Sequence, residues 1–189
     1  MGKSKMMDFP KQIDCGDFQL KLLPVSFALA QEIFDIYSSD AENMIFWLPN
    51  GLPERPEDVL VDLVNYEEDK KYCMYYIFED GVLLGQIGLS RIGWKHKNGS
   101  IGYWLKKSAR GRGIISQLLP MIERLGFETF DLRKLVINCD GLNLASRRIA
   151  EKHGYVQDAF CRQDVIWADG TIHDDCEYSK LKSEWGKVK

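Results

Sequence analysis

The 189-residue chain is 45% hydrophobic and 28% charged. These proportions predict one globular domain with a continuous core, and they argue against a disordered chain, a repeat array or a collagen-like chain. The chain has 25 Lys and Arg against 28 Asp and Glu, which gives a net charge of −3 at pH 7. A protein that binds a polyanion over a broad basic surface has a net positive charge, so we expect no nucleic-acid partner for this chain.

The cysteines and the apolar runs bear on compartment and metal binding. The five cysteines are Cys15, Cys73, Cys139, Cys161 and Cys176. Their number is odd, and they form no CxxC pair and no cluster with histidine at metal-ligand spacing, so we expect free thiols in a reducing compartment and no metal site. No apolar run reaches the ~18 residues that cross a bilayer, and residues 1–5 lack the apolar segment of a signal peptide. We therefore predict a cytoplasmic protein without a membrane partner.

The first third of the chain predicts a strand followed by two helices. Apolar and polar residues alternate over 18–22, which is the period of a strand. Ser26 is placed to cap a helix over 28–37, and a second amphipathic helix is predicted over 59–66. Prolines and a glycine between 49 and 56 separate the two helices.

The rest of the chain predicts alternating strands and helices. Segments 72–78 and 82–92 flank Asp80-Gly81, a strong signal for a two-residue hairpin. The further elements are a strand over 100–105, a helix over 113–127 with a kink or slipped start at Pro120, a strand over 135–137, a helix over 143–153 ending at Gly154, and strands through Val165 and Tyr178. We predict a mixed α/β (α+β) fold with one sheet of about seven strands, in a single domain over 13–186 with an N-terminal extension over 1–12.

A glycine-rich turn stands between the predicted strand 100–105 and the next helix. Its sequence is Arg110-Gly111-Arg112-Gly113-Ile114-Ile115-Ser116. Such a turn at a helix N-terminus leaves backbone N–H groups free to bind one anion, and the helix dipole and two arginines add positive potential. The turn lacks the Lys-Ser/Thr pair of a Walker loop and the third glycine of GxGxxG. The pattern fits a pyrophosphate cradle, but seven such residues taken alone are more often an ordinary strand-to-helix loop with solvated arginines.

At this motif the sequence resembles the GNAT superfamily of acetyl-CoA-dependent N-acetyltransferases. Within it, the sequence is most similar to the RimJ/RimL type, the ribosomal-protein alanine/serine N-acetyltransferase relatives. The family signature Q/R-x-x-G-x-G/A corresponds to Arg110, Gly113 and Ile115, and Ile115 departs from the small third residue. The resemblance runs from about Phe18 to Trp185. It includes Ile101-Gly102-Tyr103-Trp104-Leu105, Asn143-x-x-Ser146, His153-Gly154-Tyr155 and the ending 178–185.

The resemblance implies a twisted mixed sheet that splays between the fourth and fifth predicted strands, with the pantetheine arm of acetyl-CoA inserted there. Acetyl-CoA would be the acetyl donor. The residues assigned to donor binding are Trp104, Leu105, Lys106, Arg110, Gly111, Arg112, Gly113, Ile114, Ile115, Ser116, Asn138 and Asn143. Backbone groups near Trp104 would bind the pantetheine, and residues 111–116 would bind the pyrophosphate.

Amine acetylation by direct attack needs a neutral amine, an oxyanion stabiliser and an acid for the leaving thiolate. Many family members use a tyrosine as that acid, but the matching position here is Ala150. The resemblance instead gives the acid role to Ser146 and places Asn143 beside the pantetheine. Each also has a plainer interpretation, Asn143 as a helix N-cap and Ser146 as a first-turn hydroxyl bonded to the backbone.

There are three candidates for the general base that takes the proton from the attacking amine. Some RimJ/RimL relatives carry a glutamate where Val165 stands here, so the neighbouring Asp164 is the first candidate, although a regular strand would turn it to the opposite face. His173 with Asp174 is the second. The third is a relay through water.

The sequence thus predicts an N-acetyltransferase of the RimJ/RimL type that acts through a ternary complex, without an acyl-enzyme. The acceptor amine is a protein N-terminus such as that of a ribosomal protein, a polyamine, an aminoglycoside or another small amine. Trp47 and Trp94 are candidates to line its groove, unless they pack in the core. We also allow for a homodimer. The competing prediction is a non-catalytic acyl-CoA-binding sensor or interaction module, which the missing tyrosine and the open choice of base leave in place.

Overall fold

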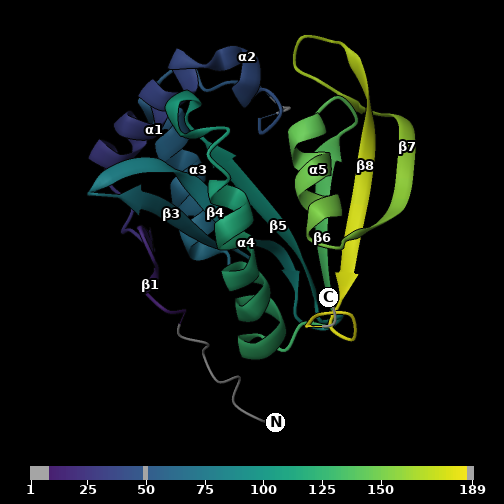
Figure 1. Ribbon diagram of the computed structural model, residues 1–189. Helices are drawn as coiled ribbons and strands as arrows, with labels where there is room; N and C mark the ends of the chain where they lie inside the picture. The colour runs from purple at the N-terminus through teal and green to yellow at the C-terminus, as the bar shows by residue number, and fades with distance from the viewer. Residues whose placement is uncertain (1–8, 49–50, 187–189) are drawn as a thin grey trace.

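The computed structural model describes residues 9–48 and 51–186, and Figure 1 shows an open sheet with helices on both faces. The strands are β1 (Gln12–Cys15), β2 (Phe18–Lys21), β3 (Cys73–Glu79), β4 (Val82–Gly93), β5 (Asn98–Leu105), β6 (Lys134–Asp140), β7 (Val156–Ile166) and β8 (Ile172–Leu181). The helices are α1 (Phe27–Ser39), α2 (Ala41–Met44), α3 (Pro56–Glu68), α4 (Ile114–Arg124) and α5 (Leu144–Lys152). A 3-10 turn (Lys107–Ala109) precedes α4, and a π turn (Leu125–Thr129) follows it. The predicted mixed α/β class is confirmed.

The eight strands form one sheet in the order β1-β2-β3-β4-β5-β6-β8-β7. Neighbours are antiparallel except β5 and β6, which are parallel. The predicted count of about seven missed β1, because a four-residue edge strand with two exposed and two half-buried residues carries almost no periodic signal. Part of the predicted extension contacts the sheet, since β1 begins at Gln12 and the Tyr75 hydroxyl donates to the Pro10 carbonyl over 2.9 Å.

β5 and β6 pair along only a short stretch. The paired residues are Asn98–Ser100 on β5 and Lys134–Val136 on β6. The remainder of β5, residues 101–105, pairs with β4 and has no ladder to β6. In Figure 1 the two strands lie together near the C-terminus and separate toward α2. The opening falls between the fourth and fifth predicted strands, so the predicted splay is confirmed.

Two apolar layers enclose the sheet. Helices α1 and α3 pack on one face, where Ile33 and Leu63 are buried with Trp104 of β5. Helix α4 packs on the other face with its neighbour α5 (Figure 1), and its apolar side is buried with the central strands in the larger core. Because successive side chains on a strand alternate between faces, Tyr103 packs against the α4 side while Trp104 packs against the α1 side.

Local signals explain several element boundaries. The Ser26 hydroxyl accepts a hydrogen bond from the Leu29 N–H over 3.2 Å, which is the predicted N-cap of α1. Asp80 and Gly81 have φ angles of 49° and 79°, as a two-residue hairpin turn with φ > 0 at both central positions requires. Helix α4 continues through the exposed Pro120, although proline has no N–H to donate to the preceding turn, and a π turn follows the helix.

The cysteines and the helices bear on the predictions of free thiols and of no membrane-spanning segment. All five cysteines are free, and Cys73, Cys139 and Cys176 are buried. Among the helices within residues 9–48 and 51–186, none combines the length and the apolar character needed to cross a bilayer.

Candidate functional site

An open pocket of about 640 Å³ lies where β5 and β6 separate. Its walls come from the end of β5, the N-terminus of α4, the start of α5 and the segment that contains α2. The sequence-predicted residues that line it are Trp104, Leu105, Arg110, Gly111, Gly113, Ile114, Ile115, Ser116, Asn143 and Ser146. Four predicted site residues are not among its lining residues, namely Lys106, Arg112, Asn138 and Asp164.

The glycine-rich turn has the geometry of an anion cradle. Gly111 and Gly113 have φ angles of 72° and 75°, a conformation that side chains other than glycine rarely adopt. A Cβ added at either glycine would meet no atom within 4 Å, so both backbones face open space. Gly113 is the N-cap of α4, whose first N–H groups have no partner within the helix. Ile114 and Ile115 bury their side chains in the core, so they can offer a ligand only their backbone. The turn therefore fits a pyrophosphate group.

Both arginines of the turn are held by protein carboxylates. The Arg110 guanidinium forms an ion pair with Asp40 at the junction of α1 and α2, and its Nε donates to the Leu105 carbonyl over 2.9 Å. The Asp40 side chain is 3% exposed. Arg112 lies 2.5 Å from a carboxylate oxygen of Glu79. The guanidinium groups expected at the phosphate are thus engaged elsewhere, and Asp40 is a residue that the sequence patterns did not single out.

Two hydroxyl groups meet inside the pocket. The Tyr103 hydroxyl lies 2.8 Å from the Ser146 Oγ, and Ser146 is 6% exposed. Burial raises the pKa of Tyr103, so the phenol keeps its proton at neutral pH. Asn143 takes the plainer role foreseen for it, because its Oδ1 accepts from the Ser146 N–H over 3.1 Å and caps α5. Ala150, the position at which the family resemblance leads one to expect a tyrosine, is fully buried. The tyrosine that lines this pocket is Tyr103 of β5.

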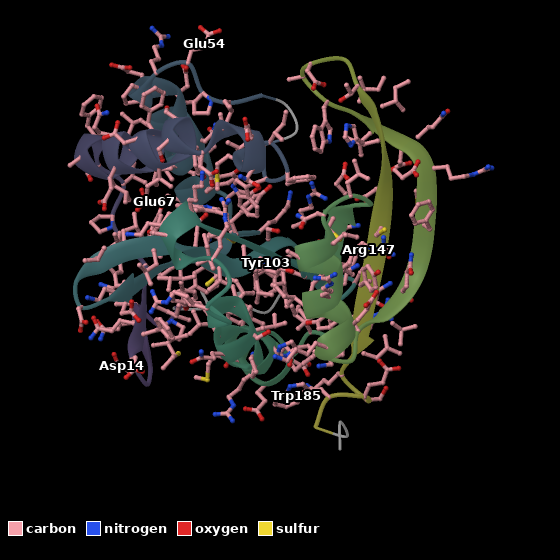
Figure 2. The ribbon with its side chains drawn as sticks, turned by 45° about the horizontal axis from the view of Figure 1, so that its top comes forward. Asp14, Glu54, Glu67, Tyr103, Arg147 and Trp185 are labelled. Atoms are coloured by element: carbon pink, nitrogen blue, oxygen red, sulfur yellow. The ribbon has the colours of Figure 1, made fainter. Side chains whose placement is uncertain are left out.

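The environment of Tyr103 is visible in Figure 2, where it lies near the centre of the molecule between the two halves of the sheet. In the sequence, Tyr103 belongs to a motif that carries the family resemblance, but the resemblance assigns it no role. The alternation of a strand could have identified Tyr103 as a candidate, because it lies on the opposite face of β5 from the core residue Trp104. Its contact with Ser146, 43 positions away, depends on how α5 packs against β5.

The carboxylate and histidine candidates for the general base lie in other surroundings. Asp164 is exposed on β7, in a stretch where the register with β8 shifts and Gln163 has a φ of 54°. The strand is irregular here, so the alternation of a regular strand does not decide which face Asp164 occupies. His173 lies 2.7 Å from a carboxylate oxygen of Asp140, whereas Asp174 accepts from the Gln163 N–H over 2.8 Å. His173 and Asp174, which are adjacent in the sequence, thus have different partners.

The imidazole of His173 is enclosed. Its ring stacks on Trp167 with the centroids 3.7 Å apart, and its Nε2 lies 2.8 Å from the Thr171 hydroxyl. Trp167 in turn contacts the edge of Phe46, a lining residue of the pocket, at 5.2 Å between centroids. This stack fastens the β7–β8 hairpin to the segment that contains α2. Both nitrogens of His173 lie near protein groups, and His173 is not among the residues that line the pocket.

The two tryptophans considered for an acceptor groove occupy different places. Trp47 lines the pocket, and its ring lies on Gly102 of β5, where an added Cβ would come within 2.8 Å of Cη2. Trp94 packs against Phe130 and donates to the Lys70 carbonyl over 3.2 Å, outside the pocket lining. Within the described part of the chain, no group of three or more His, Cys, Asp or Glu side chains could hold a metal ion.

Comparisons with known proteins agree with this geometry. Residues 19–156 match the family model of the acetyltransferase (GNAT) domain. The ribosomal-protein-serine acetyltransferase of Escherichia coli is 36% identical over 102 residues, which cover 54% of this chain and 56% of that protein. YdaF of Bacillus subtilis is 26% identical over 161 residues, which cover 82% of this chain and 87% of that protein.

A solved structure of RimL, the ribosomal L7/L12 alpha-N-protein acetyltransferase, in complex with coenzyme A has the same fold. It aligns with a TM-score of 0.77 at 22% identity and covers 90% of this chain and 97% of that one. The family match contains the strands that splay, the glycine-rich turn and the helix that carries Ser146. By that match and by this architecture, the chain belongs to the GNAT family of acetyltransferases.

Proposed function

We propose that this protein transfers an acetyl group from acetyl-CoA to the N-terminal amine of a protein substrate by direct attack. One observation carries the proposal. A single pocket contains both the glycine-rich cradle at the start of α4 and the hydroxyl pair of Ser146 and Tyr103. An anion site and a proton donor in one cavity are what a phosphorylated thioester donor and its leaving thiolate need.

The donor end of the pocket fits coenzyme A. Residues 111–116 would hold the pyrophosphate through backbone N–H groups, and residues 101–105 of β5 would take the pantetheine, because their backbone has no ladder on the β6 side. Arg110 and Arg112 would shape the turn through their carboxylate partners rather than bind phosphate. Bound there, acetyl-CoA would supply the thioester-activated acetyl group.

The residues around the reacting atoms divide the proton transfers. In direct attack the amine nitrogen forms a bond to the thioester carbon and the carbon–sulfur bond breaks, so the sulfur needs a proton and the ammonium must lose one. Ser146 would donate to the sulfur, and the neutral Tyr103 phenol, 2.8 Å from the Ser146 Oγ, would replace that proton and regain its own from water. No carboxylate or imidazole is among the residues that line the pocket. We therefore assign the ammonium proton to water, and Asp164 stays an untested prediction.

Relatives named as ribosomal-protein acetyltransferases support a protein N-terminus as the acceptor. The alternatives are a polyamine, an aminoglycoside or another small amine. The candidate from another class is a non-catalytic acyl-CoA-binding module, which the absence of a tyrosine at position 150 favours.

The test is thiol release from acetyl-CoA in the presence of an amine panel, with mass spectrometry of the products. The panel contains peptides that begin with Ser or Ala, the same peptides with a blocked N-terminus, spermidine and an aminoglycoside. Turnover of free peptides with the acetyl group on the α-amine is the expected result. Turnover confined to small amines would replace the acceptor, and CoA binding without turnover on any amine would favour the binding module.

A further inference from the structure

A second pocket, of about 400 Å³, lies on the face of the sheet covered by α1 and α3. It adjoins the first pocket, because Trp47 lines both. A second link is Trp104, which lines the first pocket and whose indole N–H donates to Gln86 in the second over 3.2 Å. Trp47 and the Trp104–Gln86 pair are therefore shared between the donor pocket and this one.

Three aromatic side chains stand among the aliphatic residues that line the second pocket. Tyr37 of α1, Tyr66 of α3 and Trp47 all line it. Burial raises the pKa of both tyrosines, so they present neutral phenols. Aromatic faces attract a cation through their quadrupole, and the attraction grows as the cation is desolvated.

The charged residues that line this pocket all have one sign. They are Glu54, Asp58 and Asp62, and no Lys, Arg or His is among the lining residues. Figure 2 shows Glu54 at the outer edge of the molecule, on the segment before α3. Asp58 is satisfied within the protein, because Arg55 lies 3.2 Å from it and the N–H groups of Glu54 and Arg55 donate to it.

Two lining carboxylates, Glu54 and Asp62, have no protein partner among the described residues, and Asp62 is the one whose charge contributes to the raised pKa of Tyr37 and Tyr66. No hydrogen bond or ion pair connects Asp62 to the described residues, and it stands one helical turn after Asp58, where like charges destabilise a helix. Partial burial and the charge of Asp58 raise its pKa. An unpaired carboxylate beside aromatic rings is the arrangement that a bound cation would complete.

We propose that this pocket binds the ammonium group of a lysine side chain close behind the N-terminal residue that is acetylated. The inference rests on the proposed function and deepens it by naming an acceptor class, peptides with an early basic residue. Asp62 supplies the counter-charge, and Tyr37, Tyr66 and Trp47 supply the aromatic enclosure. Because Trp47 also lines the donor pocket, a lysine held here keeps its own N-terminus beside the donor site.

The experiment compares matched peptides that begin with Ser and carry either lysine or norleucine at the second, third or fourth position. For at least one position, kcat/KM should be about five- to tenfold higher for lysine, as expected for one cation with a carboxylate and aromatic rings. In Asp62→Asn this ratio should fall to about one. In Glu57→Gln, which removes a charge from the same helix outside the pocket, the ratio should keep its wild-type value.

A ratio near one in the wild type at all three positions would overturn the inference while the proposed function stands. A lysine preference that survives in Asp62→Asn would overturn it as well. If no peptide is acetylated, the proposed function fails, and titration calorimetry of the lysine and norleucine peptides with the CoA-bound protein decides about the pocket. Tighter binding of the lysine peptide that is lost in Asp62→Asn would support the pocket, and equal binding would refute it.

Discussion

At the scale of single residues, Gly113 gives the sharpest test of the donor site. Its Cβ position is open space in the pocket, and its φ of 75° disfavours a side chain. Gly113→Asp places a negative charge where backbone N–H groups must meet phosphate, so CoA affinity should fall at least a hundredfold. Gly113→Ala carries only the backbone strain, about 1 kcal/mol, and should lose about tenfold or less. Titration calorimetry measures both, and equal losses would contradict an electrostatic role for this turn.

The Ser146–Tyr103 pair predicts coupled effects on turnover. Ser146→Ala should lower kcat about tenfold or more with little change in acetyl-CoA affinity, because the hydroxyl acts on the departing sulfur. Tyr103→Phe should lower kcat too, and the double variant should be no slower than the slower single variant, since both act on one proton path. The measurement is single-turnover kinetics with the chemical step limiting.

Asn143→Ala is the control for these variants, because it removes a cap worth about 1 kcal/mol and leaves both hydroxyls in place. If Ser146→Ala reacts at the wild-type rate, the thiolate takes its proton from another source. Losses in the double variant that multiply would show that the two hydroxyls act independently.

Some of the site could be predicted from the sequence because its signal is local. The glycine turn and the Asn143 cap each lie within a few consecutive residues, so their geometry follows from backbone rules. The carboxylate partners of Arg110 and His173 could not be predicted from the sequence, because only the packing of distant elements brings Asp40 and Asp140 to them. Arginines in a phosphate motif suggest phosphate contact, yet a buried carboxylate nearby is a competing partner that no motif displays.

At the scale of elements, a buried ion pair joins α4 to β8. The Lys180 Nζ lies 2.8 Å from a Glu123 carboxylate oxygen, both side chains are 4% exposed, and the ammonium stands 5.0 Å from the Tyr155 ring centroid. Lys180→Met should lower the free energy of unfolding by about 3–5 kcal/mol, because it leaves a buried carboxylate without its partner. Adding Glu123→Leu should recover most of that loss. Urea denaturation tests both, and a double variant as unstable as the single one would mean that packing, not charge, is responsible.

The elements that the sequence predicted well are those with strong periodicity or explicit turn residues. The β3–β4 hairpin follows from Asp80-Gly81 between two apolar runs, and α1 follows from Ser26 and its apolar period. β1 and the register shifts of β7 could not be predicted from such local signals. Pairing at a sheet edge and the positive φ of Gln163 depend on neighbouring strands rather than on local preference.

At the scale of the whole molecule, the two halves of the sheet share a short junction. Among the residues that the structure describes, only Asn98–Ser100 and Lys134–Val136 pair across it, and residues 101–105 remain open to the proposed donor. CoA should therefore slow amide hydrogen exchange in residues 101–105 far more than in β3. At a hundredfold excess over Kd it should also stabilise the fold by about 2.7 kcal/mol. Hydrogen exchange by mass spectrometry reads the first effect, and unchanged exchange in 101–105 would place the donor elsewhere.

The ion pair between Arg110 and Asp40 should couple the binding of the two proposed substrates. Arg110 belongs to the donor turn, while Asp40 accepts from Asn43 over 2.8 Å at the start of the segment that leads to Trp47. Ordering the turn should therefore order the Trp47 wall of the pocket proposed for the acceptor. Linkage requires reciprocity, so the factor by which CoA tightens peptide binding equals the factor by which peptide tightens CoA binding.

Asp40→Asn should bring that common factor toward one in both titrations, whereas Glu79→Gln, which breaks the other ion pair of the turn, should leave it intact. Calorimetric titration of each ligand, with and without the other, measures the factor twice. A factor that persists in Asp40→Asn would route the coupling elsewhere. A factor that falls to one in Asp40→Asn but not in Glu79→Gln would assign the coupling between donor and acceptor affinities to this one ion pair.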